Sequence, residues 1–157
     1  MIIRQIDFYT DGAFSSKTEM GGWACVALEN DGIIFEDSGY EPYSTNNRME
    51  LMAILCALET ANNIETGHTK VIIYTDSAYA ANAFNQQWYI NWLKNGWKTA
   101  DKQDVKNQDL WGRIVALYIK LKERFNLEII KVKSHAGNKW NTYVDALAVR
   151  ARQKLEI

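Results

Sequence analysis

Cysteine is scarce in this chain, with only Cys25 and Cys56 among 157 residues. They form neither a CxxC pair nor a cluster with histidine, which argues against a zinc site. Each cysteine lies in an apolar run. We therefore expect both to be buried thiols of a protein in a reducing compartment.

Long hydrophobic runs are also missing. No apolar stretch approaches the length of a membrane-spanning helix, and residues 1–5 (MIIRQ) lack the hydrophobic region of a signal peptide. These absences predict a cytoplasmic protein that does not associate with a membrane.

An excess of charge of either sign is missing as well. The formal net charge is −1 and the pI is about 6.1, so no global field attracts the chain to a polyanion. Binding to nucleic acid would have to come from a local patch or from metal ions. The hydrophobic fraction of 47% and the length of 157 residues predict one globular domain over residues 1–157.

The hydrophobic pattern predicts an α/β fold. Three strands precede any helix, and the residues Asn30, Asp31 and Gly32 are typical of a hairpin turn, so the sheet should be mixed. Residues 12–22 are expected to form a loop. The predicted order is β-β-β-α-β-α-α-β-α, with strands over residues 2–10, 22–28, 33–39, 70–75 and 127–132 and helices over about 45–63, 77–84, 110–125 and 140–155.

Four acidic residues occupy comparable places in four predicted elements. Asp76 follows the strand 70–75, Asp11 follows the strand 2–10, Glu50 opens a helix and Asp145 lies inside the last helix. Ligands of open α/β sheets bind at the carboxyl ends of strands, and grouped carboxylates are suited to a two-metal site for phosphoryl transfer. Glu50 has an alternative role as a helix cap.

Aromatic and basic residues interleave between positions 86 and 111. Aromatic rings that stack on bases beside phosphate-binding lysines are one way to hold nucleic acid. A helix with partly buried tryptophans and a solvated lysine face is the alternative, and the segment considered alone favours it. Three aspartates offset most of the lysine charge. The residues are Trp88, Trp92, Trp97 and Trp111 with Lys94, Lys98, Lys102 and Lys106, and Asp101, Asp104 and Asp109.

Short motifs along nearly the whole chain resemble, in content and order, those of type 1 ribonucleases H, which cleave the RNA strand of RNA–DNA hybrids. The motifs are residues 9–12 (YTDG), 21–23 (GGW), 45–51 (TNNRMEL), 75–77 (TDS), Trp92, 95–99 (NGWKT), 109–111 (DLW), 132–137 (VKSHAG), Asn141 and 145–148 (DALA).

This resemblance implies a five-stranded mixed sheet flanked by helices and an endonuclease that leaves 5′-phosphate and 3′-hydroxyl ends. It implies two Mg²⁺ ions, for which Mn²⁺ can substitute. By motif, Asp11, Glu50, Asp76 and Asp145 correspond to the catalytic carboxylates that bind metal. His135 resembles the histidine that assists proton transfer or product release.

The resemblance also implies contacts with an RNA–DNA hybrid. They comprise reading of the minor groove, a phosphate pocket for the DNA strand, aromatic contacts to the DNA strand and a polar contact near the scissile phosphate. Asn46 and Asn47 correspond to the minor-groove contacts, and Thr45 and Asn107 to the phosphate pocket. Trp88 and Trp92 correspond to the aromatic contacts, and Asn141 to the polar contact near the scissile phosphate.

Some positions depart from the family pattern. Residues 13–20 lack an Asn-Pro-Gly turn, Leu93 stands where lysine is usual, Ser134 replaces a glycine and Val144 replaces an alanine. The protruding segment therefore carries less positive charge than in a strongly basic relative. We expect weaker hybrid binding with a shallower dependence on salt.

Three rival interpretations remain open. They are another nuclease of the same superfamily, a hybrid-binding module without activity, and a domain of a reverse transcriptase. The motif at 45–51 argues against the first, and the complete carboxylate set argues against the second. Because Met1 directly precedes the first strand, we expect an independent protein without a separate hybrid-binding module. It should be a monomer without an obligate protein partner.

Overall fold

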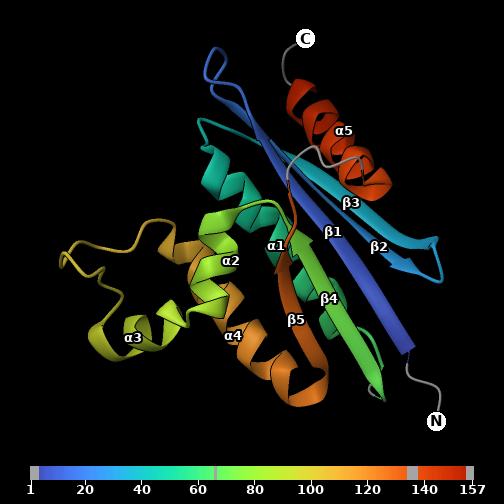
Figure 1. The fold of residues 1–157 in the computed structure, drawn as a ribbon. Helices are drawn as coiled ribbons and strands as arrows, with labels where there is room; N and C mark the ends of the chain where they lie inside the picture. Colours follow the sequence, from blue (N-terminus) through green and yellow to red (C-terminus); the bar gives the residue numbers. More distant parts are fainter. Residues whose placement is uncertain (1–3, 66, 134–137, 155–157) are drawn as a thin grey trace.

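A five-stranded mixed sheet lies at the centre of the protein (Figure 1). The computed structural model describes residues 4–65, 67–133 and 138–154. The strands follow the order β3-β2-β1-β4-β5 across the sheet, which confirms the predicted mixed sheet. They span β1 (Arg4–Phe14), β2 (Met20–Glu29), β3 (Gly32–Pro42), β4 (Thr69–Thr75) and β5 (Asn126–Lys131).

The first three strands form an antiparallel meander, whereas β4 and β5 join the sheet in parallel to β1. Between β2 and β3, Asn30 and Asp31 have φ values of 54° and 63°. Asparagine and aspartate tolerate this left-handed backbone and are preferred in tight hairpin turns. The predicted hairpin is therefore confirmed, and it explains why the sheet begins with antiparallel pairs.

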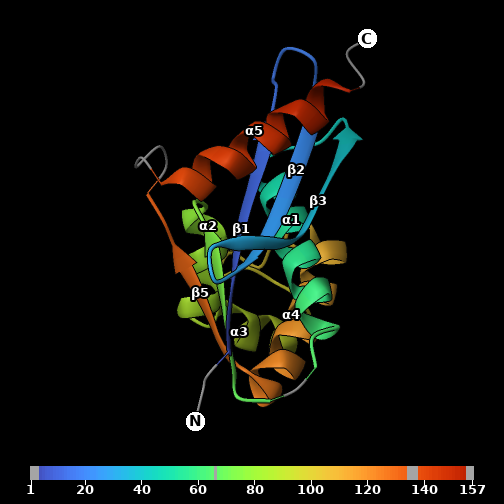
Figure 2. The same ribbon diagram turned by 90° about the vertical axis from the view of Figure 1, so that its right-hand side faces the viewer.

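Helices cover both faces of the sheet (Figures 1 and 2). On one face α1 and α4 pack on each other and on the strands, together with α2, whereas α5 crosses the other face. The helices span α1 (Asn46–Asn62), α2 (Ala78–Asn85), α3 (Trp88–Asn95), α4 (Gln108–Arg124) and α5 (Lys139–Gln153).

The alternation of side chains along β1 supplies both layers of the core. Ile6 and Phe8 point to the α1 and α4 side and are fully buried, whereas Tyr9 points to the α5 side. There Tyr9 belongs to a smaller cluster with Val144 and Ala148 of α5. None of the helices within the described ranges has the length and apolar character needed to span a membrane.

The short helix α3 and the loop that follows it project from the sheet, at the left of Figure 1. The sequence predicted this segment as a protruding helix and loop, and the structure resolves α3 as a separate helix between α2 and α4. Gly96 ends α3 with a φ of 75°, a conformation that glycine adopts without steric cost.

The prediction that β1 ends before Asp11 is wrong. β1 continues to Phe14 because Asp11 and Gly12 pair with Ala24 and Trp23 of β2. Asp11 is therefore held inside a strand rather than in a turn. The prediction that both cysteines are buried is correct for Cys25, whereas Cys56 is only partly buried.

Candidate active site

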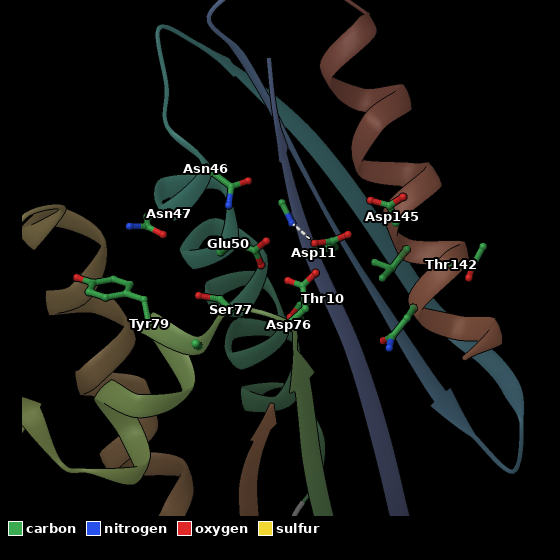
Figure 3. Close-up of a pocket in the computed structure, with 14 residues that line it drawn as sticks. Thr10, Asp11, Asn46, Asn47, Glu50, Asp76, Ser77, Tyr79, Thr142 and Asp145 are labelled. Atoms are coloured by element: carbon green, nitrogen blue, oxygen red, sulfur yellow. Dashed lines mark hydrogen bonds between the residues drawn. The ribbon is translucent and has the colours of Figure 1, made fainter. Parts of the chain in front are cut away.

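Three carboxylates from three elements meet at one edge of the sheet (Figure 3). Asp11 comes from β1, Glu50 from the first turns of α1, and Asp76 from the residue that follows β4. One oxygen of each lies within 4.8 Å of one oxygen of each of the others. The structure thus brings together three of the four carboxylates that the sequence predicted.

A glycine on β1 allows Glu50 to come this close. A Cβ atom at Gly12 would lie 2.5 Å from the backbone nitrogen of Glu50 and 2.6 Å from the carbonyl carbon of Met49, distances that real Cβ atoms do not show. Any larger residue would push α1 away from β1. Gly12 therefore sets the separation between the carboxylates of Asp11 and Glu50.

The alternative role of Glu50 as a helix cap is wrong. Thr45 caps α1, and its Oγ1 accepts a hydrogen bond of 3.1 Å from the backbone nitrogen of Arg48. Glu50 lies farther along the helix, and its side chain turns into the protein, where the residue is 3% exposed. Its burial costs stability, and this cost points to a role other than capping.

Burial and mutual repulsion perturb the acidity of this group. The pKa of Asp11 is raised to about 8, mainly by burial, then by the charge of Asp76 and by a hydrogen bond with Asp145. The pKa of Glu50 is raised well above its ordinary value by burial and by the charges of Asp11 and Asp76. Without a counter-ion the group therefore holds protons at neutral pH.

One observation shows that the site fits a divalent cation. Oε2 of Glu50 is buried and has no hydrogen-bond partner within the described residues. Buried carboxylate oxygens without a donor are rare unless a ligand satisfies them. Carboxylate oxygens are the ligands that Mg²⁺ prefers, and the oxygens of Asp11 and Asp76 lie beside Glu50.

Asp145 approaches the same place from the opposite side. It lies on α5 and lines a cleft of about 510 Å³ together with Asp11, Glu50 and Asp76 (Figure 3). Close packing of α5 positions it, because a Cβ atom at Gly22 would lie 2.2 Å from the backbone oxygen of Ala148. Asp145 contributes to the raised pKa of Asp11 but lies outside the group of three whose oxygens are within 4.8 Å.

The predicted substrate residues line two neighbouring hollows. Asn46, Asn47 and Asn141 line the cleft with the carboxylates. Thr45 and Asn107 line a wider groove of about 1080 Å³ beside α3, which shares Asn47 and Tyr79 with the cleft. The structure thus brings residues from distant parts of the chain onto one continuous surface.

The tryptophans of the projecting segment belong mainly to the core. Trp92 is 7% exposed, and its ring lies 5.1 Å from that of Trp111 and 5.8 Å from that of Trp97. Trp88 is partly buried, and its Nε1 donates a hydrogen bond of 3.0 Å to Oε1 of Gln86. Both Trp88 and Trp92 also line the wider groove, where Trp88 presents more exposed surface.

Arg48 braces the first turn of α1, and the sequence did not mark it as a candidate site residue. Its guanidinium donates two hydrogen bonds, of 3.0 and 2.7 Å, to the carboxylate of Asp109 and one of 2.7 Å to Oε1 of Glu41. It also donates to Oδ1 of Asn107 at 3.4 Å. Arg48 thereby ties the start of α1 to the start of α4, and its place in the motif 45–51 was the available signal.

Other residues that line the cleft were also missed. Ser77 caps α2 by accepting a hydrogen bond of 3.1 Å from the backbone nitrogen of Ala80, while Thr142 lines the cleft from α5. His135, predicted to assist proton transfer, and Ser134 lie outside the described residues.

Comparisons with known proteins identify the family of this chain. The RNase H family model matches residues 4–153. A ribonuclease H of Chlorobaculum parvum is 45% identical over 145 residues, which cover 92% of this chain and 93% of the relative. A ribonuclease H of Treponema denticola is 43% identical over 96% of this chain and 98% of its own length.

Solved structures show the same fold. LC9-RNase H1, a type 1 RNase H with the type 2 active-site motif, superposes with a TM-score of 0.77 at 25% identity, over 97% of this chain and 74% of its own. RNase H1 of Halobacterium salinarum gives a TM-score of 0.65 at 23% identity, over 94% of this chain and 96% of its own. Because both the sequence and the fold match over nearly the full length, the chain belongs to the RNase H family.

Proposed function

We propose that this protein is an endoribonuclease that hydrolyses the RNA strand of RNA–DNA hybrids and leaves 5′-phosphate and 3′-hydroxyl ends. Two Mg²⁺ ions, or Mn²⁺ in their place, are its cofactors. The observation that carries the proposal is the group of buried Asp11 and Glu50 with partly buried Asp76, in which Oε2 of Glu50 has no hydrogen-bond partner among the described residues. The family membership and the relatives named ribonuclease H support the substrate class.

Asp11, Glu50, Asp76 and Asp145 would hold the ions. Bound at this site, divalent ions supply a nucleophilic water at neutral pH and neutralise charge on the leaving oxygen of an in-line displacement. The carboxylates of Asp11 and Glu50 must lose their protons to act as ligands, because burial raises both pKa values. Metal binding should therefore release protons near neutral pH.

The two hollows are suited to the two strands of a hybrid. Asn46 and Asn47 lie where the cleft meets the wider groove, and their amides can hydrogen-bond 2′-hydroxyls in a minor groove, which distinguish RNA from DNA. Thr45 and Asn107 lie on the groove side, where a phosphate of the DNA strand would bind. Part of a foamy viral protease-reverse transcriptase solved with an RNA/DNA hybrid, 20% of that chain at 22% identity, shares this fold over 95% of the present chain with a TM-score of 0.77.

Several finer assignments stay predictions. Trp88, Trp92 and Asn141 are proposed to contact the hybrid. His135 is proposed to assist proton transfer or product release. The single-domain organisation, the monomeric state and the cytoplasmic location likewise rest on the sequence.

An end-labelled RNA–DNA hybrid with Mg²⁺ tests the proposal. We expect cleavage of its RNA strand only, and no cleavage of duplex DNA, duplex RNA or single-stranded RNA. Asp76→Asn and EDTA should each abolish the reaction. Asp31→Asn, which removes an exposed carboxylate from the turn between β2 and β3, should leave it unchanged. A hybrid that is bound but stays intact with both Mg²⁺ and Mn²⁺ would show a binding module instead.

A further inference from the structure

The two cysteines of the chain come close together in the tertiary structure although they are separated by a strand and half a helix. Cys25 lies on β2 and is fully buried in the main core, and Cys56 lies on α1 and packs against that core. Cys56 lines the same surface hollow as Trp23 and Asp37, which neighbour Cys25 in the sheet, and the nearby thiol of Cys56 raises the pKa of Cys25. The metal site uses neither of them, so the pair needs a separate explanation.

Only one of the two thiols faces solvent. Cys56 is partly buried and lines a surface hollow of about 540 Å³ beside Met52, Phe35 and Trp23. Cys25 has no exposed surface and does not line the hollow. A small molecule that enters the hollow can therefore reach Cys56, whereas Cys25 is closed off from solvent.

We propose that Cys25 and Cys56 are a redox-active pair that a peroxide converts into a reversible disulfide between β2 and α1. Cys56 reacts first because it is accessible, and Cys25 is the resolving thiol because it lies near Cys56. This site is independent of the carboxylate group and of the proposed ribonuclease activity.

The reaction balances in two steps. Cys56 releases its proton, its thiolate attacks one oxygen of hydrogen peroxide, and the O–O bond breaks, so that the sulfur becomes a sulfenic acid and the expelled hydroxide takes up the released proton as water. The Cys25 sulfur then attacks the Cys56 sulfur, the S–O bond breaks, and a second water carries away the hydroxyl and the Cys25 proton. Two thiols and one peroxide yield one disulfide and two waters.

The surroundings of Cys25 suit a resolving role. Its pKa is raised by the nearby thiol of Cys56, by burial and by the charge of Asp37, so it stays a thiol. A protonated, buried thiol is a poor target for an oxidant, and it attacks an adjacent sulfenic acid only as its proton passes to the departing hydroxyl, because the thiolate is the nucleophile. The hollow also contains the charged residues Asp37, Glu59 and Arg113, of which Arg113 and Glu59 form an ion pair.

The disulfide would fasten α1 to the sheet. α1 carries Glu50 six residues before Cys56, and β2 pairs with the segment of β1 that carries Asp11. A covalent link between positions 25 and 56 also restricts the unfolded chain, which stabilises the folded state. Oxidation should therefore raise the melting temperature by several degrees, and a reductant should reverse the rise.

Counting free thiols in the folded protein tests the pair. The protein is treated with hydrogen peroxide, quenched with catalase, denatured and alkylated with N-ethylmaleimide, and its intact mass is measured. We expect two labels before oxidation, none after oxidation and two again after dithiothreitol, with the protein monomeric on a non-reducing gel. Retention of both labels, a linked dimer, or oxygen addition that dithiothreitol does not restore would each overturn the proposal.

Single variants test the order of events. In Cys25→Ala, Cys56 should stop at the sulfenic acid, which dimedone captures as a covalent adduct. In Cys56→Ala, Cys25 should keep its label at the same peroxide concentration, because it is buried. Equal oxidation of Cys25 in the presence and absence of Cys56 would refute the assignment of Cys56 as the first thiol to react.

Discussion

Replacing Asp11 by asparagine in the metal-free protein should raise stability at neutral pH. The carboxyl of Asp11 is 7% exposed and lies beside Glu50 and Asp76, and these surroundings raise its pKa from the ordinary 3.8 to about 8. The folded state therefore retains a proton that the unfolded chain has released. This difference makes the free energy of unfolding depend on pH.

The sign and size follow from the two pKa values. Between pH 3.8 and about 8 the folded state binds more protons at Asp11 than the unfolded chain does. The stability that Asp11 contributes is therefore fully present below pH 3.8 and is lost as the pH rises to about 8. At about 1.4 kcal/mol per pH unit, the loss at pH 7 is about 4 kcal/mol. Because Asp11 interacts with Glu50 and Asp76, part of this energy belongs to the group of three.

Urea unfolding in EDTA at several pH values from 4 to 9 measures this effect. Wild type should lose stability relative to Asp11→Asn up to about pH 8, and saturating Mg²⁺ should restore it, because ions bind the ionised group. Asp31→Asn is the matched control, since it removes an exposed carboxylate and should follow wild type. Parallel pH profiles for wild type and Asp11→Asn would refute the reasoning.

Three further predictions concern the support of the site and its charge. Gly12→Ala should lower the free energy of unfolding by about 1–3 kcal/mol and lower kcat at least tenfold, because the added Cβ clashes with the backbone at Glu50. Urea unfolding measures the stability and hydrolysis rates measure kcat. Gly112→Ala is the control, since the space around Gly112 is open and both quantities should stay near wild type. Arg48→Ala should lower the free energy of unfolding by about 1–2 kcal/mol and raise KM more than it lowers kcat, since Asp109 and Asn107 lose their common partner. A change confined to kcat in steady-state assays would contradict this prediction. Hybrid affinity measured against KCl should fall with a shallow slope, because the net charge is −1 and few counterions are released, and a steep slope would show a basic surface that this sequence does not predict.

Local sequence patterns predicted much of the fold. Alternating hydrophobic residues located the strands, and the turn residues Asn30 and Asp31 located the first hairpin, because both signals depend on neighbours in the chain. The helix start at Thr45 was also predictable, since a threonine cap satisfies backbone groups one turn away. The end of β1 was not predictable, because its last residues are strand only through pairing with β2.

The motifs of the sequence by themselves pointed to the carboxylates that we propose to carry the chemistry, and its hydrophobic pattern predicted the order of the strands and helices. Only the tertiary structure decided that Gly12 sets the distance from Asp11 to Glu50 and that Arg48 ties α1 to α4. It also decided that Trp92 is mainly a core residue and that Cys56 lies near Cys25. Periodicity and capping act over a few residues, whereas burial and contact depend on partners that are distant along the chain.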